Sequence, residues 1–245
     1  MNIEGRTILI TGASRGLGRA LAFACAAAAA KEIFAGARKP SDIDRLKQDA
    51  RDIGAAITPI KLDVTKTQDI EATKQLGTID VLINNAGVAG YGNPVSMNFD
   101  QAMHEMEVNY FGALRMSRAL APQMMERGEG VIVNVATAFA RVNLPLVGTY
   151  CASKAALLSL GQALRAYLAD NGVHVMTVMP TTIDTDMSKG AAVPKMTTGF
   201  VAGEIMRHIR EESIDPPIGE EAAGIFEGLR TDATGLEKML SKIRG

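Results

Sequence analysis

The chain has 245 residues, of which 47% are hydrophobic and 22% are charged, and its formal net charge is -1. A chain of this length and composition can bury the core of one sizeable α/β domain. The near-zero charge and the scattered Lys and Arg residues argue against nucleic acid or an anionic membrane as a partner.

Short β-branched runs alternate with longer helical stretches along the chain. Strands are predicted, in chain order, at 7–10, 32–37, 57–62, 81–84, 130–135 and 174–179. Helices are predicted at about 16–30, 41–53, 66–76, 99–127, 149–171 and 200–212. Several strands are continuous apolar runs, which is typical of strands buried on both faces of a parallel sheet. The alternation therefore predicts a single α/β domain over residues 1–245, with a doubly wound parallel β-sheet between two layers of helices.

The two ends of the chain are less regular. The segment 188–198 mixes Gly, Pro, Lys and Thr, and we expect it to be a mobile lid over the substrate. Residues 213–245 form an atypical C-terminal segment, with Pro216-Pro217, a Lys-rich helix ending near Ile243 and no Gly-rich final strand. No leader-like segment precedes the first strand, and the longest apolar stretch, 21–30, is too short to cross a bilayer. A soluble cytoplasmic protein is expected.

A glycine-rich turn, TGASRGLG at 11–18, joins the first strand to the first helix. Glycines in this context let the backbone approach a pyrophosphate, and the helix N-terminus favours an anion there. The spacing is not the usual dinucleotide-binding one, so a simple strand-to-helix turn is the alternative interpretation. The candidate nucleotide contacts are Gly12, Ser14, Arg15, Gly16, Leu17 and Gly18.

The end of the second strand indicates which nucleotide binds. An acidic residue there would bind the ribose of NAD, whereas an arginine accommodates the 2′-phosphate of NADP. Arg38 lies twenty positions after Gly18, Arg15 offers a second guanidinium, and the segment from Phe34 to Asp42 has no acidic residue before Asp42. The sequence therefore favours NADP(H) over NAD(H), with two solvated surface arginines as the alternative.

Tyr150 and Lys154 are four positions apart in a predicted helix, and a hydroxyl residue, Thr137, lies thirteen positions before the tyrosine. Positions i and i+4 share one helix face, so the phenol and the ammonium project into one site. A nearby cation favours the phenolate, and we expect it to lower the pKa of the phenol enough for acid–base chemistry.

Taken together, the turn at 11–18, Asn84-Asn85-Ala86-Gly87 and the Tyr150/Lys154 spacing resemble the short-chain dehydrogenase/reductase (SDR) family over about residues 5–187. The resemblance implies a Rossmann-type fold and an oxidoreductase that interconverts a carbonyl and an alcohol with NADP(H). It implies that Tyr150 exchanges the proton with the substrate oxygen and that Lys154 lowers the pKa of the phenol and binds the nicotinamide ribose. Asn109 would hold a water in the proton relay.

The family pattern is broken at two positions. The usual catalytic serine is Thr137, whose extra methyl stiffens χ1 and narrows the pocket. The usual Pro-Gly pair is Pro180-Thr181, so a positive φ at Thr181 would be strained. These departures keep open an alternative, a catalytically impaired NADP(H)-binding protein that acts as a redox sensor or interaction partner. The resemblance adds further cofactor contacts at Asp63, Val64, Asn85, Ala86, Gly87, Pro180, Ile183 and Thr185.

The substrate pocket is expected at the carboxyl ends of the strands and is mostly apolar. Its candidate residues are Tyr91, Phe139, Leu144 and Met187. Arg141 could bind a carboxylate, but a solvated rim position is preferred, which favours a neutral apolar ketone or alcohol. No metal is expected, since Cys25, Cys151 and the three histidines show no ligand spacing and the cysteines are expected to pack in helices. The resemblance implies a homodimer through the helices at 99–127 and 149–171, with a tetramer as the alternative.

Overall fold

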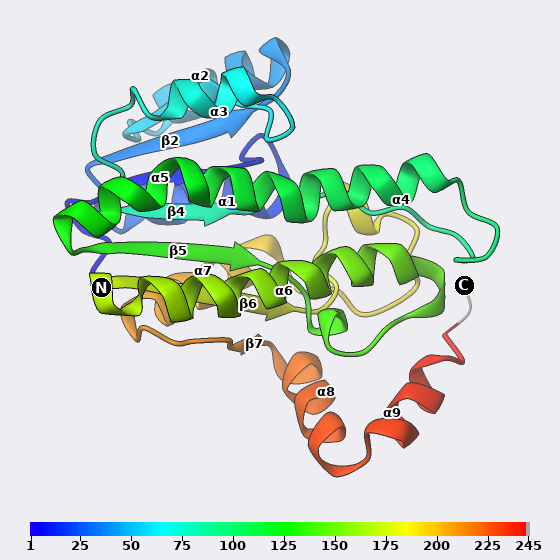
Figure 1. Ribbon diagram of the computed structural model, residues 1–245. Coiled ribbons are helices and arrows are strands. Elements are labelled where there is room, and N and C mark those ends of the chain that lie inside the picture. Colours follow the sequence, from blue (N-terminus) through cyan, green and yellow to red (C-terminus); the bar gives the residue numbers. More distant parts are fainter. Residues whose placement is uncertain (244–245) are drawn as a thin grey trace.

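The computed structural model describes residues 1–243, and its centre is a seven-stranded parallel sheet (Figure 1). The strand order is β3-β2-β1-β4-β5-β6-β7, so the winding direction reverses between β1 and β4. The strands are β1 Thr7–Ile10, β2 Glu32–Ala37, β3 Ile57–Lys61, β4 Val81–Asn84, β5 Gly130–Val135, β6 Val173–Pro180 and β7 Pro217–Ile218. The predicted doubly wound α/β fold is confirmed, and so are its six predicted strands.

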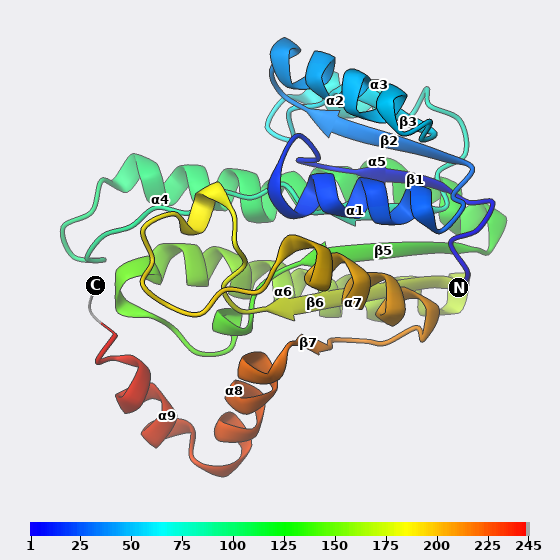
Figure 2. The ribbon, with the colours of Figure 1, turned by 180° about the vertical axis from the view of Figure 1, so that it is seen from behind.

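Helices cover both faces of the sheet and give three layers (Figures 1 and 2). Alternate residues of β1 feed the two cores: Ile8 and Ile10 pack on one face, Leu9 on the other. The first face is covered by α1 Gly16–Ala27, α2 Pro40–Asp52 and α7 Thr198–Arg210. The second is covered by α3 Thr67–Thr73, α5 Ala113–Arg127 and α6 Gly148–Leu168, while α4 Phe99–Met106 contributes no residue to this core.

The predicted helix 99–127 exists but is not a regular α-helix throughout. A π-helical turn, Glu107–Gly112, joins α4 to α5, and this turn contains Asn109. A π turn inserts one extra residue into the helix and is found most often at functional sites. Asn109 and Val108 are buried within it.

The C-terminal segment differs from its prediction. A final strand does exist: β7 pairs in parallel with β6, through Met179 with Pro217 and Pro180 with Ile218. With only two residues, β7 shows no strand pattern in the sequence. Its proline is tolerated because β7 is the edge of the sheet. Two helices follow instead of one, α8 Glu220–Thr231 and α9 Ala233–Leu240. Residues 244–245 of the predicted segment lie outside the described residues.

Both cysteines are free and buried, Cys25 in α1 and Cys151 in α6, as predicted. Within residues 1–243, no helix is both long and apolar enough to cross a membrane.

Candidate active site

The carboxyl ends of β1, β4, β5 and β6 meet at one edge of the sheet, next to the reversal between β1 and β4. Such an edge is where open α/β sheets bind their ligands. The glycine-rich turn follows β1, Asn85 to Gly87 follow β4, Thr137 follows β5 and Pro180 ends β6. The structure therefore gathers at one edge the four segments that the sequence singled out.

The glycine-rich turn is built so that side chains would not fit. Gly12 has φ +66°, and a Cβ added to it would lie 2.8 Å from the Ala86 Cα atom. A Cβ on Gly18 would clash with the Gly12 carbonyl oxygen and the Asn85 side chain. The Asn85 amide donates to the carbonyl oxygens of Thr11 and Gly12, both at 3.0 Å, and so ties the β4 end to the turn.

The N-terminus of α1 is open to an anion. Arg15 is its N-cap residue, yet no side chain caps the helix and its first turn carries no acidic residue. Free backbone N–H groups and the helix dipole there suit a phosphate group. Together with the glycines, whose missing side chains leave the backbone accessible, this arrangement fits the pyrophosphate of a dinucleotide.

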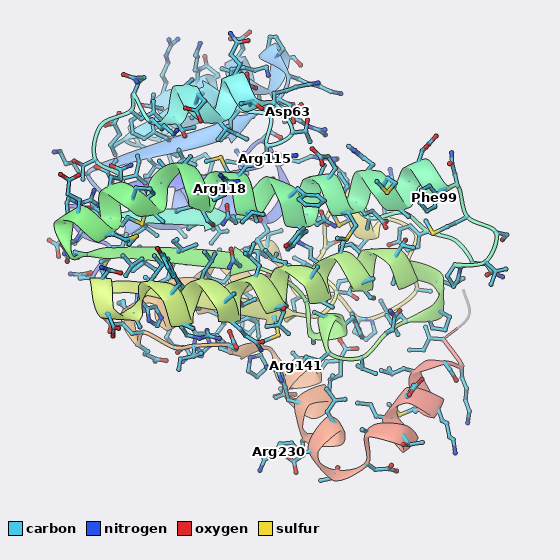
Figure 3. The ribbon with its side chains drawn as sticks, viewed as in Figure 1. Asp63, Phe99, Arg115, Arg118, Arg141 and Arg230 are labelled. Carbon is cyan, nitrogen blue, oxygen red and sulfur yellow. The ribbon has the colours of Figure 1, made fainter. Side chains whose placement is uncertain are left out.

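The carboxyl ends of β2 and β3 carry exposed cations beside an acidic group. Arg38 follows β2 and is exposed, and it makes no ion pair with another described residue. Burial alone would raise the pKa of Asp63, but hydrogen bonds from Thr65 and the charges of Arg38 and Lys61 lower it below its ordinary value. Asp63 follows β3 at the top of the molecule in Figure 3. The charge of Arg38 thus acts on the Asp63 carboxyl group.

Arg15 and Arg45 occupy different positions near the same turn. Arg45, on α2, donates to the Ser14 carbonyl oxygen at 2.9 Å, a contact that the sequence did not indicate. Arg15 instead forms an ion pair with Asp186, which lies just before the predicted lid. Its role as a second phosphate ligand stays a prediction.

Tyr150 and Lys154 lie in the first two turns of α6, on one face, as their spacing predicted. Lys154 is only 4% exposed, and its ammonium donates to the Val135 carbonyl oxygen at 2.8 Å. Its Nζ atom lies 5.9 Å from the centroid of the Tyr150 ring. Burial lowers the pKa of Lys154 to about 8.

The pKa of Tyr150 shifts in the direction opposite to the prediction. Burial, followed by the charges of Cys151, Tyr91 and Glu105, raises it above its ordinary value. The prediction took account of the cation but not of the desolvation of the phenol, which disfavours the phenolate. The protonated form of the phenol is therefore favoured in this structure.

Asn109 holds the π-helical turn against two other parts of the site. Its side-chain amide bonds both backbone groups of Val88, with Oδ1 accepting at 2.8 Å and Nδ2 donating at 2.9 Å. Nδ2 also donates to the Ser153 hydroxyl at 2.8 Å, and that hydroxyl donates to the Tyr150 carbonyl oxygen at 2.7 Å. A Cβ on Gly87 would lie 3.3 Å from both Asn109 Oδ1 and Lys154 Nζ, so these two polar groups face the same space.

Thr137 lies at the end of β5 and is 3% exposed. Its hydroxyl donates to the Pro180 carbonyl oxygen at 3.0 Å and accepts from the Phe139 N–H at 3.3 Å. The hydroxyl therefore has a partner for its single proton, and it must turn from Pro180 to donate to a substrate.

The second departure from the family pattern produces no strain. Thr181 is buried, and the only non-glycine residues with positive φ among residues 1–243 are Ala29 and Glu212. Beyond Thr181 the chain forms a loop, and an isolated parallel bridge between Ile183 and Met196 joins the two ends of that loop. Thr185 begins a short 3-10 turn through a capping box with Ser188.

The predicted lid is anchored where it begins. The Tyr91 hydroxyl, from the loop after β4, donates to the Met187 carbonyl oxygen at 3.1 Å. Tyr91 and Met187 are 59% and 39% exposed. These two predicted pocket residues are thus in contact with each other. The mobility of 188–198 stays a prediction.

The other two predicted pocket residues pack against the C-terminal helices. Phe139 belongs to an apolar cluster with Tyr150 and Leu144 at its border, and α8 and α9 contribute four buried residues to it, Ala222, Ile225, Leu236 and Leu240. Arg141 lies over the Phe226 ring of α8, 4.6 Å from its centroid, and points toward that helix in Figure 3. Arg141 is exposed and its guanidinium lies on an aromatic ring, which agrees with the rim position that the sequence favoured for it.

Comparison with known proteins decides the family. The family model for "short chain dehydrogenase" matches residues 6–194. The chain belongs to the short-chain dehydrogenases.

Relatives of this short-chain dehydrogenase include well-separated species. An NADP-dependent 3-hydroxy acid dehydrogenase of Schizosaccharomyces pombe is 33% identical over 193 residues, covering 76% of this chain and 74% of that protein. A ketoacyl reductase of Nostoc is 32% identical over 225 residues, covering 87% and 78%. A solved short-chain dehydrogenase from Burkholderia cenocepacia, in complex with NADP, is 34% identical, with a TM-score of 0.90 and coverage of 98% and 99%.

Sequence analysis of this short-chain dehydrogenase missed three features of the site. Ser153 was not among the predicted site residues, yet it connects Asn109 to the tyrosine helix. Glu105, an acidic residue in a helix, gave no signal that it is buried. The packing of α8 and α9 against the apolar cluster beside Tyr150 could not be predicted, because the C-terminal segment carries no family pattern. Within residues 1–243, no group of His, Cys, Asp and Glu side chains could hold a metal ion.

Proposed function

We propose that this short-chain dehydrogenase is an NADP(H)-dependent oxidoreductase that interconverts a ketone or aldehyde and its alcohol by hydride transfer. The observation that carries the proposal is the Tyr150/Lys154 pair on one face of α6, beside Asn109 and facing the edge where the glycine-rich turn lies. The NADP-bound relative at 34% identity supports the choice of cofactor, as do Arg38 and the lack of an acidic residue at the end of β2.

Each residue has a defined task in the proposed reaction. NADPH, when bound, supplies the hydride. Tyr150 gives its hydroxyl proton to the carbonyl oxygen in reduction, and its phenolate removes the alcohol proton in oxidation. Lys154, held by Val135, presents its ammonium to the ribose and to the phenol. Asn109 fixes the loop after β4 and keeps its amide beside Lys154.

The remaining cofactor contacts follow from the fold. The turn residues Gly12 to Gly18 would hold the pyrophosphate, while Arg38 would pair with the 2′-phosphate and Asp63 and Val64 would meet the adenine. Pro180, Ile183 and Thr185 would hold the nicotinamide end. These assignments are supported by the positions of the segments at one edge of the sheet.

The proposed substrate is neutral and apolar. The residues near Tyr150 form an apolar cluster with α8 and α9, and Arg141 lies on the Phe226 ring. The curated relatives suggest the contrasting class, since a 3-hydroxy acid dehydrogenase and a ketoacyl reductase take substrates with a carboxyl or acyl group. Initial rates with matched apolar ketones and 3-oxo acids would choose between the classes. Higher kcat/KM for the acids would refute the apolar substrate.

Measuring NADPH oxidation against a panel of ketones and aldehydes tests the proposed activity itself. Binding of NADPH is measured separately by fluorescence. Turnover that is lost in Tyr150→Phe is the expected result. Intact NADPH binding without turnover of any carbonyl would instead favour the second candidate, a catalytically impaired NADP(H)-binding protein. One observation favours that candidate: the Thr137 hydroxyl donates to Pro180 rather than into the site.

We also propose a homodimer formed by α4, α5 and α6. On these helices and the π-helical turn between α4 and α5, Phe99, Met103, Phe111 and Tyr167 are 73%, 53%, 39% and 73% exposed. Figure 3 shows Phe99, Arg115 and Arg118 along the outer side of α4 and α5. Exposed apolar groups rimmed by charge are typical of protein interfaces. Light scattering of the purified protein tests this, and a monomer would refute it.

A further inference from the structure

The glycine-rich turn lies against the end of β2 on one of its sides. The Ala13 N–H donates to the Gly36 carbonyl oxygen of β2 at 2.8 Å, and Arg45 ties α2 to the same turn. Arg38, the proposed partner of the 2′-phosphate, follows β2 directly. The turn, which continues into Arg15, and Arg38 therefore lie at the same end of β2.

The Arg15 side chain is directed to the other side of the turn, towards the segment that follows β6. Its guanidinium forms an ion pair with Asp186, the only carboxyl group paired with it among residues 1–243. The neighbouring residues also meet, because a Cβ on Gly16 would lie 3.1 Å from the Thr185 methyl carbon. Figure 2 shows this segment, in yellow, beside the blue turn before α1. Two consecutive residues of the turn thus face two consecutive residues of this segment.

The segment that carries Asp186 is fixed by its own hydrogen bonds. The Ser188 hydroxyl donates to the Ile183 carbonyl oxygen at 2.6 Å and accepts from the Thr185 N–H at 3.3 Å. Backbone hydrogen bonds to Met196, on either side of Ile183, close the loop that contains the predicted lid. The Asp186 carboxylate is therefore held beside the glycine-rich turn, and it connects that turn to the base of the predicted lid.

The ion pair occupies a cation next to the place where the proposed function puts a polyanion. The side chains of Arg15 and Asp186 are 65% and 66% exposed, and exposed ion pairs contribute little to stability. A phosphate group offers more acceptor oxygens than a carboxylate and up to two negative charges, so it is the stronger partner for a guanidinium. Arg15 can therefore exchange the carboxylate for a phosphate group.

We propose that Asp186 competes with a phosphate group of NADP(H) for Arg15, so that the ion pair forms in the free protein and is exchanged when the cofactor binds. The inference rests on the proposed function, which supplies the cofactor. Asp186 is then a positioning residue for Arg15 that lowers cofactor affinity. The exchange also removes the tie between the glycine-rich turn and the base of the predicted lid.

Asp186→Asn tests the inference, because asparagine keeps the size of the side chain and removes its charge. The Kd for NADPH, from fluorescence titration at low ionic strength, should fall about two- to fivefold, which is the strength of an exposed ion pair. Asp184→Asn is the matched control, since Asp184 is an exposed acid two positions earlier and forms no ion pair with another residue of 1–243. Its Kd should stay at the parent value.

A double-variant cycle separates competition for Arg15 from the general effect of one negative charge fewer. In the Arg15→Gln background, Asp186→Asn should leave the Kd for NADPH unchanged, because no guanidinium is released. An unchanged or higher Kd in the single variant Asp186→Asn would overturn the proposal. So would an equal gain in Asp184→Asn, or a gain that persists with Arg15→Gln.

Titration with NADH identifies the phosphate group involved. A gain for NADPH alone assigns the 2′-phosphate, whereas an equal gain for both cofactors assigns the pyrophosphate, which both contain. These titrations need no turnover, so the two proposals can fail separately. Binding of NADPH without reduction of any carbonyl refutes the proposed function, and the titrations still decide about Asp186. A parent protein that binds neither cofactor overturns both proposals.

Discussion

The nucleotide end and the catalytic corner of the site are built in opposite ways. The proposed nucleotide end consists mainly of backbone groups. The surroundings of Gly12 and Gly18 leave no room for a Cβ, and α1 begins without a side-chain cap. The catalytic corner consists of buried polar side chains from several elements, Asn109, Thr137 and Lys154. The first end is therefore sensitive to added volume, and the second to removed or added charge and hydrogen bonds.

The largest expected effect lies at the catalytic corner. Tyr150→Phe should lower kcat/KM at least about a thousand-fold, because it removes the proton that the carbonyl oxygen needs. NADPH affinity, measured by fluorescence titration, should remain nearly unchanged, since the ring is kept. Tyr167→Phe, at an exposed position of the same helix, is the control. A substantial remaining rate would remove Tyr150 from the acid–base role.

At the nucleotide end the matching change is an added methyl group. Gly18→Ala places a Cβ against the Gly12 carbonyl oxygen and the Asn85 amide, so the turn must move. NADPH should bind about a hundred-fold more weakly, which corresponds to about 3 kcal/mol. Gly203→Ala, in a helix where the Cβ meets nothing within 4 Å, is the control for a glycine-to-alanine change. Equal affinity in both variants would contradict the proposed pyrophosphate site.

Charge at the nucleotide end should set the choice of cofactor. Arg38→Asp removes the proposed partner of the 2′-phosphate and supplies a carboxylate for a ribose hydroxyl. The ratio of kcat/KM for NADPH to that for NADH should fall at least about tenfold, because hydrogen bonds to charged groups contribute about 1.5–3 kcal/mol. Arg51→Asp, in the last turn of α2, controls for the change in net charge. An unchanged ratio would place Arg38 outside the site.

The smallest effect is expected at Thr137, where the two candidate functions diverge. Thr137→Val keeps the shape and removes the hydroxyl, and kcat/KM should fall about tenfold if that hydroxyl assists the substrate oxygen. Thr137→Ser keeps the hydroxyl and should stay within about threefold of the parent protein. Thermal unfolding of each variant is recorded alongside, because the valine also leaves the Pro180 carbonyl oxygen without its donor. A rate equal to the parent's in the valine variant would exclude Thr137 from the reaction.

The contrast between the two ends also explains what could be predicted from the sequence. Glycine spacing, apolar strands and the i, i+4 pair are local patterns, so the sheet, the turn and the Tyr150/Lys154 face were foreseen. The direction of the Tyr150 pKa shift was not, because desolvation depends on what α8, α9 and Glu105 place around the phenol. The short strand β7 carries no pattern of its own and forms because β6 offers it an edge.

The π-helical turn Glu107–Gly112 has a consequence for how one long helix serves two purposes. An α-helix turns about 100° per residue, so one extra residue in a turn rotates everything before it relative to everything after it by about that angle. Downstream, Met116, Leu120 and Met124 face the sheet. Upstream, Glu105 is directed to the loop after β4 instead, where it accepts from the Gly90 N–H, and Asn109 within the turn bonds Val88 of the same loop. The π-helical turn thus changes which side of the helix faces the protein interior. One end of the helix packs on the sheet, and the other end faces the proposed reaction site.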